Sequence, residues 1–271
     1  MPPAISVAIN TLNEEANIAD CIQSVQGLAD EVVVCDMHST DRTAEIARSL
    51  GARVTLIEAA FSDFGRMRFL AVQQTQNPWV LVIDADERMT PDLALQLRQI
   101  AAEDKVDVVF LTNLYWYFGG WVLHGIFNAL QQPRFFRRSA YLSSNVDSDE
   151  LVHSDLSALY GVSNRVSLPK KYHLRHYAYP TIEKYVSKTL GMYARVQAEQ
   201  YSKQGRKFSF IHLLGEPAFV FIDSFIWRGG YRDGLRGFIL TVLYAGYRFT
   251  TWANVWLLEE MQRPGPVQPG Q

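Results

Sequence analysis

Short apolar runs alternate with helical spacings over roughly the first 115 residues of the chain. The runs are typical of buried strands and lie at residues 5–9, 31–36, 53–57, 79–83 and 106–111. Between them, apolar residues recur at helical spacing, which predicts helices over residues 18–25, 44–50 and 69–74 and a further one opening at Thr90-Pro91-Asp92. This alternation of strand and helix predicts a doubly wound α/β unit with a mainly parallel sheet.

The pattern loosens beyond Leu111 into an aromatic stretch and then a basic one, Arg134-Phe135-Phe136-Arg137-Arg138. Residues 181–201 have the spacing of an amphipathic helix, and the tail after Met261, with its Pro and Gly residues, is typical of disorder. We therefore expect an α/β domain over residues 1–180, a helical, basic and aromatic region over residues 181–262 that faces an acceptor or a membrane, and a disordered tail over residues 263–271.

Composition adds a division of charge to this picture. The 271 residues suffice for one large α/β domain with an appendage or for two modest domains, and 48% apolar content argues against wholesale disorder. The net charge of -2 gives no general attraction to nucleic acid. Residues 1–150 hold 11 Lys and Arg against 20 Asp and Glu, whereas residues 151–271 hold 15 against 8. The acidic half suits a metal site and the basic half an anionic acceptor or a membrane surface, although ordinary solvated faces explain the same charges.

Cys21 and Cys35 fall in an expected helix and an expected strand, without a CxxC pair or a metal-type spacing. We therefore expect reduced thiols in the core. Met1-Pro2-Pro3 lacks the positive region and the long apolar region of a secretory signal, so we expect the chain in the cytoplasm.

The clearest chemical signal is Asp84-Ala85-Asp86, directly after the apolar run at residues 79–83. Carboxylates at positions i and i+2 of an extended chain lie on one side of it, and hard oxygen ligands suit Mg²⁺ or Mn²⁺. Such a metal also bridges phosphate oxygens and neutralises charge on a departing diphosphate. The simpler alternative is that the two acidic residues cap the helix that begins at Thr90.

Polar residues also follow the first two expected strands, with Thr11, Asn13 and Glu14 after the first and Asp36, Ser39 and Asp41 after the second. Ligands of doubly wound sheets bind at the carboxyl ends of the strands, where such side chains can hydrogen-bond a nucleobase and a ribose. Turn and cap chemistry explains Ser39 and Asp41 equally well, whereas Asp36 at the strand end favours ligand binding. The sequence contains neither GxGxxG nor GxxxxGK[ST], which argues against a Rossmann dehydrogenase and a P-loop NTPase.

These segments together resemble an inverting family 2 glycosyltransferase of the GT-A fold. The resemblance rests on residues 6–15, Asp30–Asp36, Ser39-Thr40-Asp41 and Asp84-Ala85-Asp86-Glu87. The middle and the end of the chain resemble the bacterial lipopolysaccharide-core glucosyltransferase branch, in Phe64–Arg68, the region of Trp121, Arg134–Arg138, Val152-His153, His176–Tyr179 and residues 230–238. The likeness spans nearly the whole chain, and it implies a GT-A domain with a helical C-terminal extension.

The resemblance also implies a role for individual residues. Asp36 would contact the nucleobase, and Asp84 and Asp86 would bind the metal and the sugar diphosphate. His176 occupies the place of a late metal or diphosphate contact in relatives. Arg66 and Arg68 would reach the donor, which suits the bidentate pairing of arginine with phosphate. A surface salt bridge with Asp63 or Glu58 is the alternative for these arginines.

One departure from the family concerns the general base, which must take a proton from the acceptor hydroxyl during inverting transfer. The branch typically has Glu directly after Val-His, where this chain has Ser154. Asp155 is the first candidate to replace it, followed by Asp149 or Glu150. His153 is a candidate to orient the acceptor, and an inactive or altered site is the alternative.

The C-terminal region raises the question of a membrane. Residues 238–247 are largely apolar until Arg248, a stretch too short and too polar for a spanning helix. Its aromatic and basic residues suit either a helix lying at a membrane interface or a helical subdomain packed in the ordinary way; they are Trp227, Tyr244, Tyr247, Trp252, Trp256, Arg228, Arg232, Arg236 and Arg248.

The resulting hypothesis is a metal-dependent inverting glycosyltransferase. It would move a hexose, glucose from UDP-glucose by family analogy, onto a lipid-linked glycan or a lipopolysaccharide-core acceptor, with Mg²⁺ or Mn²⁺ and in the cytoplasm or at the inner face of its membrane. A non-catalytic nucleotide-sugar-binding scaffold at the membrane is the alternative. A nucleotidyltransferase is disfavoured, because Asn13–Asn17 stands where such enzymes have a Gly-rich phosphate loop.

Overall fold

The computed structural model describes residues 2–58, 64–143 and 156–262. The chain divides into two compact units. The sheet unit comprises residues 1–114 and 130–178, and the helical unit comprises residues 115–129 and 179–271. The C-terminal helices therefore belong with a segment from the middle of the chain, which the sequence pattern did not indicate.

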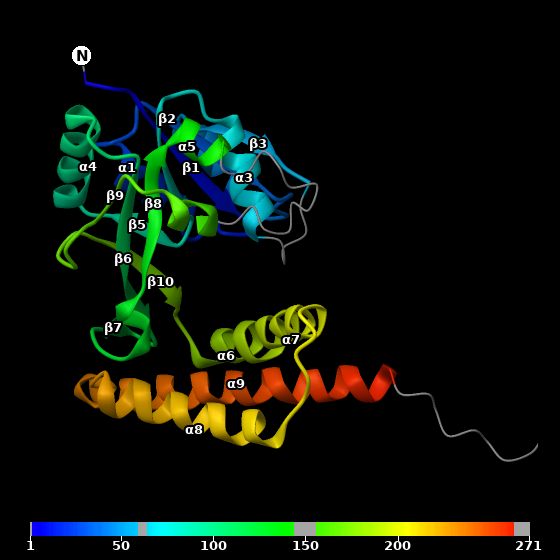
Figure 1. The fold of residues 1–271 in the computed structure, drawn as a ribbon. Helices are drawn as coiled ribbons and strands as arrows, with labels where there is room; N and C mark the ends of the chain where they lie inside the picture. The colour runs from blue at the N-terminus through cyan, green and yellow to red at the C-terminus, as the bar shows by residue number, and fades with distance from the viewer. Residues whose placement is uncertain (1, 59–63, 144–155, 263–271) are drawn as a thin grey trace, which may run out of the picture. The chain divides into compact units, whose positions relative to one another are not determined.

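The first half of the sheet is parallel, in the order β3-β2-β1-β4. Its strands are β1 (Ile5–Thr11), β2 (Glu31–Asp36), β3 (Arg53–Leu56) and β4 (Trp79–Asp84), and the connecting helices are α1 (Ile18–Val25), α2 (Thr43–Ser49) and α3 (Phe64–Gln74). These elements confirm the alternating pattern expected from the sequence. Figure 1 shows them in blue and cyan.

The second half of the sheet is mostly antiparallel, which the sequence analysis did not predict. From β4 the order continues β8-β6-β10-β5, and both β7 and β9 pair with β6. The strands are β5 (Glu87–Met89), β6 (Val108–Tyr117), β7 (Gly120–Val122), β8 (Gln131–Arg137), β9 (Arg165–Ser167) and β10 (His173–Tyr179). The intervening helical elements are α4 (Pro91–Glu103), η1 (Ile126–Ala129), α5 (Arg138–Ser143) and η3 (Leu156–Gly161). The expected Pro at the first turn of α4 is present, and the Thr90 hydroxyl caps that helix by accepting from the Leu93 amide.

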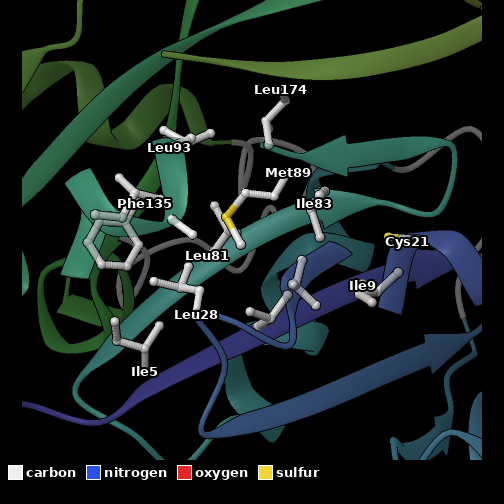
Figure 2. Close-up of a cluster of buried hydrophobic side chains, with 14 of the residues drawn as sticks. Ile5, Ile9, Cys21, Leu28, Leu81, Ile83, Met89, Leu93, Phe135 and Leu174 are labelled. Atoms are coloured by element: carbon white, nitrogen blue, oxygen red, sulfur yellow. The ribbon is translucent and has the colours of Figure 1, made fainter. Parts of the chain in front are cut away.

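Alternate residues of the central strands feed two apolar clusters. Ile5, Val7 and Ile9 of β1 join the cluster that includes Cys21 and Leu93, part of which Figure 2 shows. Ala8 of β1 joins the other cluster, with residues of α3 and α5. A central parallel strand is covered in this way on both faces, which explains why it reads as a continuous apolar run. Both cysteines are free and buried, as expected, and burial raises the pKa of the Cys35 thiol to about 12.

The helical unit consists of long helical stretches. Thr181 caps a continuous stretch made of α6 (Ile182–Tyr185), η4 (Val186–Tyr193) and α7 (Ala194–Lys203), which confirms the amphipathic helix expected over residues 181–201. A second stretch contains η5 (Ile211–Gly215), α8 (Glu216–Phe221) and η6 (Ile222–Trp227), and after η7 (Gly230–Asp233) the chain forms α9 (Gly234–Gln262). α8 and α9 lie side by side (Figure 1). Among the described residues, none of the helices combines the length and the apolar character needed to cross a bilayer.

Candidate active site

The candidate site lies at the carboxyl ends of the parallel strands. In the register of the sheet, Asn10 of β1 pairs with Asp84 of β4, and Thr11 of β1 pairs with Asp36 of β2. The polar residues that end these three strands are therefore neighbours, although Asp36 and Asp84 are far apart in the sequence. This is the edge at which ligands of α/β sheets bind.

Asp84 faces two arginines. Its Oδ2 atom lies 3.5 Å from Arg68 Nη2 and 3.4 Å from Arg134 Nη2. Arg134 Nη2 also lies 3.0 Å from Oε1 of the buried Glu87, and the Arg134 side chain is only 3% exposed. Burial by itself would raise the pKa of Asp84, but the guanidinium groups of Arg68 and Arg134 outweigh it and hold that pKa well below its ordinary value. The buried Arg134 and the partly exposed Arg68 thus favour the ionised form of Asp84.

The chain turns sharply after Asp84. Glu87 closes the turn, because its Oε2 accepts a hydrogen bond of 3.0 Å from the Asp84 amide. Arg88 Nη1 donates to the Ala85 carbonyl at 2.9 Å, and β5 begins at Glu87. Asp84 therefore ends the extended strand β4, whereas Asp86 lies in the fixed turn between β4 and β5. They contact different partners as a result.

Asp86 faces His176. The Nε2 atom of His176 lies 3.3 Å from Asp86 Oδ2, and its Nδ1 lies 3.5 Å from Glu87 Oε1. The amide of the next residue, Tyr177, donates to the Asp86 carbonyl at 2.9 Å, so β10 is tied to the turn. Burial would lower the pKa of His176, but the carboxylates of Asp86, Glu87 and Asp84 outweigh it and raise that pKa to about 9. Burial raises the pKa of Glu87 despite the nearby Arg134.

A second group of polar atoms lies at the ends of β1 and β2. At these two strand ends, three of the described side chains have buried atoms without a hydrogen-bond partner; the atoms are Oδ1 and Nδ2 of Asn10, Oγ1 of Thr11 and Oδ2 of Asp36. The other oxygen of Asp36 accepts from the amide and the hydroxyl of Ser39, at 2.9 and 2.7 Å. An unsatisfied buried polar group lowers the stability of the fold by about 1–3 kcal/mol, so the presence of such groups needs an explanation.

Asn13 and Glu14 join the loops that follow β1 and β2. The Asn13 amide donates to Ser39 Oγ at 2.8 Å, and Asn13 Oδ1 accepts from the Thr40 amide at 2.8 Å. The Glu14 amide donates to Thr43 Oγ1 at 2.8 Å, and the Glu14 carbonyl accepts from the first amides of α1. Ser39 likewise has turn chemistry, one of its two expected roles. The nucleotide contacts expected of Asn13 and Glu14 stay predictions.

The structure unites Asp84, Asp86, Arg68 and His176, as the sequence suggested, and it adds residues that the sequence analysis had not placed in the site. The additional residues are Asn10, Glu87, Asn113 and Arg134. Asn113 Nδ2 donates to Glu87 Oε1 at 2.5 Å. Arg66 precedes Arg68 by two positions on α3, so the two side chains leave the helix in different directions. Asp149, Glu150 and Asp155 lie outside the described residues, so the choice of general base stays a prediction.

The arrangement of these side chains meets part of what a divalent metal requires. Among the described residues, no group of three or more His, Cys, Asp or Glu side chains is placed to hold a metal ion. However, Asp86 Oδ2 and His176 Nε2 lie 3.3 Å apart, and adjacent ligands of an octahedral ion with bonds of about 2.1 Å lie roughly 3 Å apart. These two side chains fit neighbouring positions around one ion, and further ligands would have to come from a substrate or from water.

Comparison with known proteins defines the class of this fold and site. Residues 6–148 match the model of glycosyl transferase family 2. An uncharacterised glycosyltransferase of Rickettsia typhi is 31% identical over 93% of this chain and 86% of its own length. The lipopolysaccharide core biosynthesis glycosyltransferase LpsC of Rhizobium meliloti is 27% identical over 93% of this chain and 92% of its own.

Solved structures show the fold. A crystal structure of S. aureus TarS 1–349 gives a TM-score of 0.52 at 16% identity and covers 96% of this chain and 92% of that one. A structure of glucosyl-3-phosphoglycerate synthase from Mycobacterium tuberculosis, with Mn²⁺, UDP and glucosyl-3-phosphoglycerate, gives 0.51 at 20% identity and covers 76% and 82%. The sheet unit thus has the GT-A fold of nucleotide-sugar transferases. The chain belongs to glycosyl transferase family 2, and it is a glycosyltransferase.

Proposed function

We propose that this enzyme transfers a hexose from a UDP-sugar, UDP-glucose in the first instance, to a lipid-linked glycan or lipopolysaccharide-core acceptor with inversion. The observation that carries the proposal is the set of unpartnered buried polar atoms at the ends of β1 and β2, beside the acidic and basic cluster at the end of β4. The first group suits a nucleoside and the second suits its diphosphate.

The nucleoside end follows from the chemistry of Asp36 and Asn10. A carboxylate accepts hydrogen bonds, so Asp36 Oδ2 would accept from the N3–H of uracil. The Asn10 side chain would donate a hydrogen bond from Nδ2 to a neighbouring carbonyl of the base, and its Oδ1 would accept a second hydrogen bond. Cytosine presents an acceptor in place of N3–H, and the Asp36 carboxylate would reject it. The nucleotide in the structures of TarS and of glucosyl-3-phosphoglycerate synthase is UDP, which supports a uridine donor here.

The diphosphate end would involve Arg68, Asp86 and His176. Asp86 and His176 are the residues that would hold Mg²⁺ or Mn²⁺. Asp84 would contact the sugar diphosphate of the donor. The metal would supply positive charge to the departing diphosphate. Arg68 lies at the partly exposed side of Asp84 and would pair with a phosphate oxygen. Arg134, buried behind Asp84, would keep that carboxylate ionised and oriented.

The acceptor side depends on relatives and on residues outside the described part of the chain. The lipopolysaccharide core role printed for LpsC supports a lipid-linked glycan acceptor. Asp155 would take the proton from the attacking hydroxyl, with Asp149 or Glu150 next in order. Ser154 cannot serve as the base unaided, since a serine hydroxyl is not ionised near neutral pH.

The test is turnover and binding of a panel of nucleotide sugars with and without Mn²⁺, in wild type, Asp86→Ala and Asp92→Ala. Asp92 is an exposed carboxylate in the first turn of α4 and serves as the matched control. Metal-dependent release of UDP from one donor, lost in Asp86→Ala and kept in Asp92→Ala, is the expected result. Donor turnover that is equal in all three proteins and indifferent to metal would overturn the metal assignment, and preference for a donor other than a uridine sugar would overturn the nucleoside assignment.

A further inference from the structure

The helical unit exposes an unusual amount of apolar side chain. The stretch from residue 210 to residue 227 carries seven large apolar side chains that are at least 40% exposed, which form its exposed row; they are Phe210, Ile211, Leu214, Phe219, Ile222, Ile226 and Trp227. Ile211 is 80% exposed and Phe210 is 72% exposed. Isolated exposed apolar residues are normal, but a continuous row of them marks a surface that something covers.

α9 carries a second row on one side of the helix. The exposed residues of this row are Leu235, Phe238, Val242, Phe249 and Trp256. At 100° per residue these five positions fall within about 60° of one another around the helix axis. The buried residues of α9 fall on another side of the helix, centred about 130° from this row; they are Gly237, Leu240, Thr241, Thr251, Trp252 and Val255. The helix therefore has a packed side and, beside it, a largely exposed apolar side.

Phe238 joins α9 to the stretch 210–227 through two less exposed rings. Its ring centroid lies 5.7 Å from that of Phe225 and 6.1 Å from that of Phe221, both on the stretch 210–227. Close by, the backbone of α9 at Gly237 packs against the Gly230 carbonyl of η7, where a Cβ atom would not fit. We call the two rows together the apolar face of the helical unit.

Basic residues outnumber acidic ones around this face, although α9 also carries Glu259 and Glu260 near its end. Residues 203–257, all of which the structure describes, contain seven Lys and Arg against three Asp and Glu. Each of the three acidic side chains is partly buried and engaged: Glu216 with Arg248, Asp223 with Arg228 and Asp233 with His124. The exposed basic residues lie at the two ends of the stretch 210–227; they are Lys203, Arg206 and Lys207 before it, and Arg228 and Arg232 after it.

We propose that the apolar face docks on an anionic lipid bilayer as a peripheral membrane surface. Exposed aromatic and aliphatic side chains flanked by basic residues are what the boundary between lipid headgroups and acyl chains favours. Basic residues at both ends of the face match a negatively charged headgroup layer. The docking surface differs from the set suggested by sequence, because Trp252 is buried and Arg248 pairs with Glu216 and Tyr201 inside the unit.

The proposal concerns the acceptor side of the proposed reaction, but its test needs no donor and no turnover. The full chain is sedimented with phosphatidylcholine vesicles that either contain or lack phosphatidylglycerol. The first variant, Ile211→Asn with Leu235→Asn, changes one residue in each row. Leu95→Asn is the matched control, since Leu95 on α4 is 73% exposed and lies in the sheet unit. The second variant, Arg206→Gln with Lys207→Gln, removes two flanking charges.

The expected result is binding to the anionic vesicles that falls at least about tenfold in the Ile211→Asn, Leu235→Asn variant and is unchanged in Leu95→Asn. Binding should also fall in the basic variant and with added salt. Unchanged melting temperatures would show that the variants fold. The proposal would be overturned if the wild-type protein did not bind the anionic vesicles, or if the Ile211→Asn, Leu235→Asn variant bound them as well as wild type. A wild-type dimer that the apolar variant dissociates, without vesicle binding, would make the face a contact between copies and overturn it too.

Discussion

At the scale of single residues, the cluster around Asp84 depends on a buried arginine that sequence reasoning did not place there. Arg134 stands in a run that resembles a solvated basic patch, Arg134-Phe135-Phe136-Arg137-Arg138. In β8 it is nearly fully buried against Asp84 and Glu87. Nothing in the local sequence separates this arginine from Arg137 or Arg138, because its partners lie about 50 residues earlier in the chain.

Arg134→Met should therefore destabilise the sheet unit strongly. The substitution leaves the carboxylates of Asp84 and Glu87 buried with less compensation, and breaking a buried pair costs about 3–5 kcal/mol. Arg68→Met should cost less, because the Arg68 side chain is more exposed and Arg134 still faces Asp84. Urea unfolding of the two variants and wild type gives the comparison. Equal losses of unfolding free energy, or a larger loss for Arg68→Met, would contradict this account of the cluster.

The turn after β4 is a second feature at this scale that the sequence predicted only in part. The spacing of Asp84 and Asp86 correctly suggested that both belong to the site, but the sequence analysis assumed an extended chain. Glu87 bonds back to the Asp84 amide and forces a turn, so one aspartate faces arginines and the other faces His176. The identity of the residues was predictable, whereas the direction of their side chains depended on tertiary contacts.

At the scale of elements, periodicity predicted the parallel half of the sheet well and the antiparallel half poorly. The strands β1, β2 and β4 are central and apolar on both faces, so their signal is strong. The strands β5, β7 and β9 have three residues each, too few for any periodic signal. α9 lies within the helical region expected over residues 181–262, but its length was not predicted, because Arg248 interrupts its apolar residues. Inside the unit Arg248 contacts Glu216 and Tyr201.

Glu31 joins residues at the amino-terminal ends of the parallel strands, and its contribution to the stability of the fold should vary with pH. Its carboxylate accepts from the Ser6 hydroxyl at 2.5 Å, from Arg53 at 2.7 Å and from the Gln76 amide at 2.9 Å. Burial opposes ionisation, but these hydrogen bonds outweigh it and lower the pKa of Glu31 below its ordinary value of 4.5. A lowered pKa stabilises the folded state above pH 4.5, and this stabilisation is lost as the pH falls through the folded-state pKa.

Glu31→Gln should accordingly reduce the free energy of unfolding by about 1 kcal/mol at pH 7. The difference from wild type should shrink steadily below pH 4.5 as the wild-type carboxylate takes up a proton. Urea unfolding across this pH range measures the difference. Glu45→Gln is the control, because the Arg42–Glu45 pair is exposed and should contribute little. A deficit in Glu31→Gln that persists unchanged into acid would show that its cause is steric and not the charge.

At the scale of the whole molecule, the domain boundary expected from the sequence differs from that of the folded units. The residue pattern predicts a boundary at residue 180, between an α/β domain and a helical region. The helical unit also includes residues 115–129. Hydrogen bonds between residues more than 90 positions apart in sequence, such as Ile126 to Ser224, hold this segment in the unit, and no composition or periodicity signal reports such contacts.

A chain truncated after residue 180 should therefore be unstable because of residues 115–129. In the intact chain the amides of Leu123 and His124 donate to Asp233 Oδ2 at 3.1 and 2.8 Å, and the ring of Phe127 packs on Tyr244 at 5.1 Å. Truncation removes these partners and exposes Phe127 and its neighbours. A second truncated chain, in which a short Gly-Ser linker replaces residues 118–129, removes the exposed segment itself. We expect the linker version to melt roughly 5–10 °C higher and to aggregate less than the simple truncation. If the simple truncation instead matches the linker version in melting temperature and solubility, then residues 115–129 do not depend on the helical unit.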